Sequence, residues 1–137
     1  MDTRLVELWD KSKDNIRTRL VNEYDNIDEY KDLLIIILTE FAKTAEEDYK
    51  LADFNIGEHR VGDYTGDIVF VYVFGYRYWD PDLYICKIEY GSCSGCDSLL
   101  AALSYKNKEK GVDALLTLCL HIVQRSKNCY DIFMGGE

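Results

Sequence analysis

The stretch of sequence that decides the fold is Asp67-Ile68-Val69-Phe70-Val71-Tyr72-Val73-Phe74. It is rich in β-branched and aromatic residues, which fit a pleated sheet, so we expect a strand over Asp67–Tyr78. Apolar residues fill both odd and even positions instead of alternating with polar ones. Because successive side chains of a strand point to opposite faces, this pattern predicts a strand that is covered on both sides.

The residues on either side of this strand predict its neighbours. Asp80-Pro81-Asp82 is typical of a turn, and Leu83–Tyr90 after it has the composition of a second strand. Since a connection this short joins antiparallel strands, we expect the two to pair in that direction. Upstream, Glu58–Val61 is expected to form a shorter strand before a turn at residues 63–66.

Amphipathic patterns predict helices before and after the strands. The first is expected over Thr3–Val21, and the second over Ile27–Leu51, where Asn26 and Glu29 resemble a capping box. A short helix is expected at Asp97–Leu103 and a longer one at Val112–Ser126. The apolar stripe of the first helix consists of Leu5, Leu8, Trp9, Ser12, Ile16 and Leu20.

These elements predict an α+β fold in a single domain spanning residues 1–137. A small antiparallel sheet of two to four strands is expected to pack against N-terminal and C-terminal helices. Residues 1–52 form the helical N-terminal part and residues 53–126 the sheet with its following helices. Residues 127–137 are expected to be a loose tail or an extension of the sheet edge.

Composition and charge limit the classes of function that are possible for this protein. The chain has 137 residues, of which 47% are hydrophobic, and a formal net charge of −9. A surface this acidic repels phosphates, which argues against direct binding of nucleic acid. The charge either keeps the protein soluble, which is the commoner role of such a surface, or engages a basic protein partner. The absence of a signal pattern and of a long apolar run argues against membrane association. We therefore expect a cytoplasmic protein.

Five cysteines and one octapeptide are the features that could carry chemistry. An odd number of cysteines without a secretion signal favours free thiols over a disulfide framework. Two of the cysteines lie in the octapeptide, between the second expected strand and the short helix. The octapeptide is Tyr90-Gly91-Ser92-Cys93-Ser94-Gly95-Cys96-Asp97.

The octapeptide can be interpreted as a structural turn or as a site of thiol chemistry. Its glycines fit a tight turn, its serines can cap the next helix, and its cysteines can be small buried residues. Cys93 and Cys96 also have the spacing of a zinc half-site, which Cys119 and His121, or Cys86 and His59, would have to complete. On a helical wheel Cys119 and His121 diverge, which argues against the first pair. A nucleophilic cysteine paired with His121 or His59, and a redox pair, are the further thiol hypotheses.

Aromatic residues suggest a second candidate surface. Alternation places Tyr72 and Phe74 on one face of the first strand, and Tyr84 and Tyr90 on one face of the second. If these faces coincide, they form either a core beneath helices or a tyrosine-rich binding surface. In the second case Arg77, nearby in the sequence, could meet an anionic ligand such as a nucleotide.

Three segments together resemble a family of small bacteriophage proteins whose signature is the octapeptide itself. The resemblance covers about residues 58–126. It rests on Asp63-Tyr64-Thr65-Gly66-Asp67-Ile68, on the octapeptide followed by Ser98-Leu99, and on Leu118-Cys119-Leu120-His121-Ile122-Val123-Gln124. It implies a phage accessory protein, and such proteins often disarm host enzymes or defence systems by blocking a basic groove or sequestering a signalling nucleotide.

The sequence and the resemblance together favour a protein that binds and inhibits a host or anti-phage defence component. The expected binding surface comprises Tyr84, Arg77 and the octapeptide: Tyr90, Gly91, Ser92, Cys93, Ser94, Gly95, Cys96 and Asp97. No cofactor is expected. The alternatives are a thiol- or zinc-dependent enzyme that uses Cys93, Cys96 and His121, and a structural subunit of a homo-oligomer.

Overall fold

The computed structural model describes residues 3–45, 54–62, 66–74, 82–91 and 98–129. The chain begins with helix α1 (Thr3–Glu23), a 3₁₀ turn η1 (Tyr24–Asn26) and helix α2 (Tyr30–Thr44). Three strands follow, β1 (Gly57–Val61), β2 (Gly66–Val73) and β3 (Leu83–Tyr90). Helices α3 (Ser98–Leu103) and α4 (Lys108–Arg125) and the two-residue strand β4 (Lys127–Asn128) complete it.

The strands form an antiparallel sheet in the order β1-β2-β3-β4, so the predicted α+β class is confirmed. The register places Phe70 opposite Cys86 and Tyr72 opposite Tyr84. The segment 127–137, expected to be loose or an edge extension, therefore starts as an edge strand that places Asn128 opposite Tyr84.

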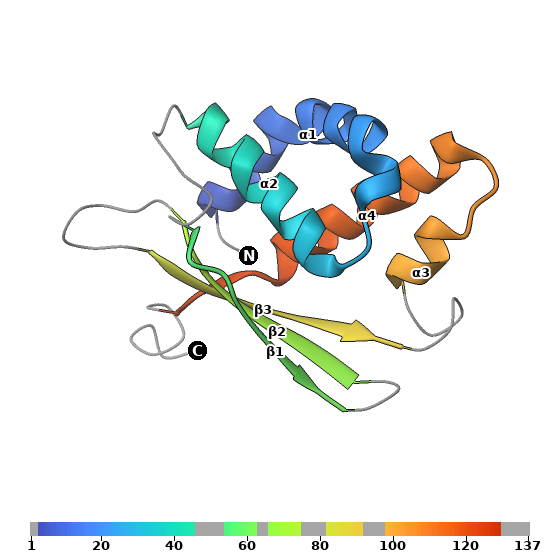
Figure 1. Cartoon of the computed structure of the whole chain (residues 1–137). Helices are drawn as coiled ribbons and strands as arrows, with labels where there is room; N and C mark the ends of the chain where they lie inside the picture. The colour runs from blue at the N-terminus through green and yellow to red at the C-terminus, as the bar shows by residue number, and fades with distance from the viewer. Residues whose placement is uncertain (1–2, 46–53, 63–65, 75–81, 92–97, 130–137) are drawn as a thin grey trace.

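The described helices all lie on one face of the sheet (Figure 1). Along β2, buried and half-buried residues alternate, with Ile68, Phe70 and Tyr72 buried beneath the helices. The expectation that this strand is covered on both faces is wrong for the described residues. The strand is apolar on both faces because of its sequence, but the described helices form only one covering layer.

The core confirms the apolar stripe predicted for the first helix. In α1 the six residues of the predicted stripe, from Leu5 to Leu20, are buried, including the hydroxyl residue Ser12. The Ser12 hydroxyl shares a hydrogen bond of 2.6 Å with Thr44 of α2, which satisfies it inside the core. Since α2 lies between α1 and the sheet, it is buried around most of its circumference (Figure 1).

Helix boundaries differ from the predicted ones where side chains cap a later or an earlier turn. Helix α2 starts at Tyr30 rather than near Ile27, because Glu29 is its N-cap and forms a capping box with Asp32. Helix α4 starts at Lys108 rather than Val112, since the Asn107 side chain accepts a hydrogen bond from the Lys110 N–H. Residues 108–111, which precede the predicted start, are thus helical as well.

Candidate functional site

The described part of the octapeptide lies at one corner of the sheet. Tyr90 ends β3, Gly91 is buried, and α3 begins at Ser98. Six residues of the octapeptide lie outside the described residues: Ser92, Cys93, Ser94, Gly95, Cys96 and Asp97. Arg77 also lies outside them. The described residues of α2, β1, β3 and α3 form the remainder of this corner.

A cavity of about 230 Å³, which we call the corner cavity, opens beside Tyr90. Segments far apart in the sequence line it: the start of α2, β1, the end of β3 and α3. The lining residues are Asp28, Glu29, Tyr30, Arg60, Tyr90, Gly91, Leu99 and Leu100. Of these, Tyr90 and Gly91 belong to the binding surface predicted from the sequence. The other lining residues carry no local motif, and only the tertiary arrangement brings them together.

The polar groups of the corner cavity hold the fold together. The Tyr90 hydroxyl donates to the Gly62 carbonyl at 2.8 Å, which ties β3 to the end of β1. The Tyr30 hydroxyl donates to the Glu89 carbonyl at 3.5 Å and accepts from the Leu99 N–H at 3.2 Å. Both tyrosines therefore join separate elements, which is a structural role.

Arg60 is the cation of the corner cavity. Its guanidinium bonds the Glu58 carboxylate at 2.9 Å and lies 3.7 Å from the Glu29 carboxylate. It also lies over the Tyr90 ring, 5.6 Å from the centroid. The hydrogen bond to Glu58 is the main reason that the pKa of Arg60 is raised. An arginine with these partners stabilises the corner, and the lining residues that the structure describes include no cysteine or histidine.

The predicted aromatic surface is a core feature. Tyr84 is 1% exposed and stacks on Tyr72, with ring centroids 5.4 Å apart and an interplanar angle of 13°. Both rings point toward the helices, so the two strand faces coincide as expected but form the covered face. Tyr84 is therefore not accessible to a ligand, which corrects its selection as a binding residue.

The thiol alternatives depend on Cys93 and Cys96, which lie outside the described residues, so the structure shows only the residues expected to complete their sites. Cys119 is buried in α4, whereas His121 is exposed, so the two side chains diverge as the helical wheel predicts. Burial raises the pKa of Cys119 well above its usual range and that of Cys86 to about 11. Within the described ranges no three His, Cys, Asp or Glu side chains gather as a metal site would require.

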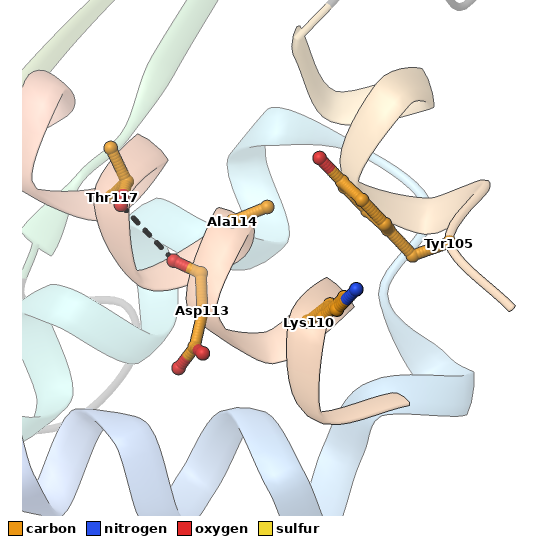
Figure 2. A pocket seen from close by; sticks show the side chains of 5 residues that line it. All are labelled: Tyr105, Lys110, Asp113, Ala114 and Thr117. Carbon is orange, nitrogen blue, oxygen red and sulfur yellow. Dashed lines mark hydrogen bonds between the residues drawn. The ribbon is translucent and has the colours of Figure 1, made fainter. Parts of the chain in front are cut away.

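A second cavity, of about 280 Å³, lies between α4 and the residues that follow α3 (Figure 2). The cavity is lined by Tyr105, Lys110, Asp113, Ala114 and Thr117, none of which belongs to the binding surface predicted from the sequence. The Asp113 carboxylate forms an ion pair with Arg17 of α1, and the Thr117 hydroxyl donates to the Asp113 carbonyl at 3.1 Å. Asp113 of this cavity thus helps to join α1 to α4.

The most unusual surface is the sheet face that points away from the helices, which we call the open face. Strand register assigns it the following side chains: His59, Val61, Asp67, Val69, Val71, Val73, Leu83, Ile85, Lys87, Glu89 and Lys127. An antiparallel sheet with one solvated face normally carries polar residues there. Here the middle strand carries Val69, Val71 and Val73 instead.

The open face also brings two like charges together. Asp67 on β2 is directly opposite Glu89 on β3, at the end of the sheet away from Val73 and Leu83. Neither carboxylate has an ion-pair partner among the described residues. Like charges at directly opposed positions destabilise a sheet. The open face therefore combines an aliphatic strip with an acidic end.

Among the helices that the structure describes, none is long and apolar enough to cross a bilayer. No protein-family model, curated protein or solved structure matches the chain in the three comparisons, so the bacteriophage resemblance stays a prediction.

Proposed function

We propose that this protein is a bacteriophage accessory protein that acts by binding, and that it inhibits a host or anti-phage defence protein through the open face. The observation that carries the proposal is the strip of Val69, Val71 and Val73 on a sheet face that no described helix covers. Contiguous apolar surface of this kind is typical of protein–protein interaction sites.

Charge indicates which surface the partner presents. The acidic end of the open face, Asp67 with Glu89, lowers the stability of the free sheet, and an arginine or lysine of a partner would remove this repulsion. The net charge of −9 would steer association toward a basic surface in the same way. We therefore expect a partner with an apolar ridge that has a basic residue at one end.

Catalysis has less support than binding. The described cysteines Cys86 and Cys119 are buried with raised pKa values, and a protonated buried thiol is a poor nucleophile. The hydroxyls at the corner cavity are engaged in bonds between elements. Cys93 and Cys96 lie outside the described residues, so a thiol function for them is tested separately.

The test is capture of a partner from a bacterial lysate, followed by affinity measurements with the purified partner. Val71→Lys puts a charge in the strip and is expected to weaken binding at least about 10-fold. Val21→Lys, at a 41% exposed valine of α1, is the matched control and should bind like the wild type. Equal affinity of all three proteins for the captured partner would contradict the proposal.

Glu89→Lys separates a functional role of the acidic end from a structural one. This substitution converts the repulsion with Asp67 into an attraction, so it should stabilise the fold by about 0.5 kcal/mol. If the acidic end receives a basic partner residue, the same variant binds the partner more weakly. A variant that is more stable and binds undiminished would remove the acidic end from the site.

The competing functions give different results in simple measurements. A protein with both Cys93→Ser and Cys96→Ser should still bind its partner, whereas a thiol or zinc enzyme would lose its function. Native mass spectrometry of protein purified under reducing conditions distinguishes the remaining cases. Added mass of one zinc ion would support the metal hypothesis, and added mass of a few hundred daltons would support nucleotide sequestration.

A further inference from the structure

Strand β1 forms one edge of the sheet and carries a charge pattern that is complementary to itself. All five of its residues, Gly57–Val61, are exposed. It pairs with β2 residue for residue over its whole length, without a bulge, and in the described chain no strand lies on its other side. Natural proteins usually protect such an edge, because it can pair with another chain.

We propose that β1 pairs with β1 of a second copy, antiparallel and about a two-fold axis at His59. In this register Glu58 of one protomer faces Arg60 of its partner, and Arg60 faces Glu58. Gly57 faces Val61 at both ends. Two opposite-charge pairs form, and each lies at directly opposed positions, where charges interact most strongly in a sheet.

The charge pattern also disfavours the other ways in which two β1 strands could pair. Moving the axis to Glu58 places Glu58 against its own copy, and moving it to Arg60 does the same for Arg60. A parallel pairing in register would oppose like charges at both positions. Of these arrangements, only the register centred on His59 pairs all five residues and places each charge opposite one of the other sign. An edge strand that only had to avoid pairing would not need this order of charges.

The ends of this register fit as well as its middle. Val61 is 53% exposed, the highest exposure among the large apolar side chains described, and it would lie across from a glycine. Nothing crowds this position, since a Cβ atom added at Gly57 would meet only the Val71 carbonyl oxygen, at 3.8 Å. A symmetry axis perpendicular to the sheet joins two four-stranded sheets with both open faces on the same side.

Arg60 and Glu58 also form an ion pair within one chain, so a single substitution cannot separate this role from a role between chains. An experiment that mixes two variants separates them. Glu58→Arg leaves two arginines on the edge, and Arg60→Glu leaves two glutamates. Each variant repels its own copy, whereas one copy of each attracts the other at both positions. An effect confined to single chains cannot restore pairing on mixing.

The measurement is sedimentation equilibrium at about 5 to 500 μM, a range suited to a small transient interface, with native mass spectrometry of the mixtures. We expect the wild type to dimerise, each single variant to dissociate about 10-fold more readily, and the mixture to form the heterodimer. A monomeric wild type over this range overturns the proposal. So does a wild-type dimer that both single variants retain.

His59 supplies a second pair of variants if charge reversal at Arg60 disturbs the corner cavity. His59 is exposed and faces its own copy on the axis. His59→Lys and His59→Glu should each weaken the dimer, and an equimolar mixture should restore it as a heterodimer. A mixture that stays monomeric while the wild type dimerises would place the dimer interface elsewhere and overturn the proposal.

Discussion

The hydroxyl of Tyr30, at the start of α2, accepts a hydrogen bond of 3.2 Å from the backbone N–H of Leu99, in the first turn of α3. The same hydroxyl donates to the Glu89 carbonyl of β3 at 3.5 Å. One buried side chain, 3% exposed, thus joins α2 to two elements that lie far from it in the sequence. This contact sets the wall of the corner cavity.

Replacing Tyr30 by Phe removes both hydrogen bonds while keeping the ring. We expect the free energy of unfolding to fall by about 1 to 3 kcal/mol, because buried polar groups lose their partner. Urea denaturation measures the change. Tyr105→Phe is the control, since Tyr105 is 49% exposed and its hydroxyl should be dispensable. Equal stability of the two variants would mean that the Tyr30 hydroxyl does not hold this corner.

Gly66 and Gly57 form a matched pair on the first hairpin. A Cβ atom at Gly66 would lie 1.8 Å from the Val61 carbonyl oxygen, whereas Gly57 has space for one. Gly66→Ala should therefore destabilise the protein by about 3 kcal/mol or more, since β1 and β2 must separate to admit the methyl group. Gly57→Ala should change stability by less than about 0.5 kcal/mol.

Thermal unfolding at low protein concentration compares the two glycine variants without a contribution from dimerisation. A Gly66→Ala protein as stable as Gly57→Ala would show that the hairpin does not make the close approach described.

Glu40 is a carboxylate that is 5% exposed within α2. It accepts hydrogen bonds from Arg19 of α1 and from Lys43, each at 3.2 Å. Glu40→Ala should lower the free energy of unfolding by about 1 to 3 kcal/mol, because it removes the bond that joins the two helices. Glu23→Ala, which removes a more exposed partner of Arg19, is expected to cost at most about 1 kcal/mol.

The Glu40 comparison should be made by denaturation in urea and not in guanidinium chloride, because an ionic denaturant screens the ion pairs. If Glu23→Ala proved the more damaging change, the pairing with Arg19 would depend on the i, i+4 bond within α1 and not on the contact between helices.

The buried thiols predict a loss of stability at alkaline pH. Burial raises the pKa of Cys86 from 9.0 to about 11, so the unfolded chain releases this proton at a lower pH than the folded one does. The contribution of Cys86 to stability is fully present below pH 9 and declines as the pH rises toward 11. Cys119, whose pKa is also raised by burial, acts in the same direction.

Urea midpoints at several pH values between 8 and 11 test this window. A variant with Cys86→Ala and Cys119→Ala should lose less stability across the window than the wild type, which isolates the thiols from tyrosines and lysines. Ellman's reagent gives an independent reading in a variant with Cys93→Ser, Cys96→Ser and Cys129→Ser, because the two remaining thiols should react only after unfolding. Immediate reaction of this variant in its native state would contradict the burial of Cys86 and Cys119.

Much of the fold follows from local patterns in the sequence. The stripe from Leu5 to Leu20 predicted which surface of α1 is buried, since a period of 3.6 residues allows one continuous apolar face. The run Asp67–Phe74 and the short connection before Leu83 likewise predicted an antiparallel pair. These features depend on neighbours in the chain, so the sequence alone determines them.

Only the tertiary structure decided which surfaces are covered. The apolar character of Val69, Val71 and Val73 predicted a second covering layer, but the described helices pack on the opposite face, which leaves these valines on the open face. The sequence likewise could not place Asp67 against Glu89 or gather the corner cavity around Tyr30. Such contacts join residues distant in the chain, and they depend on strand register and helix packing, which no local pattern encodes.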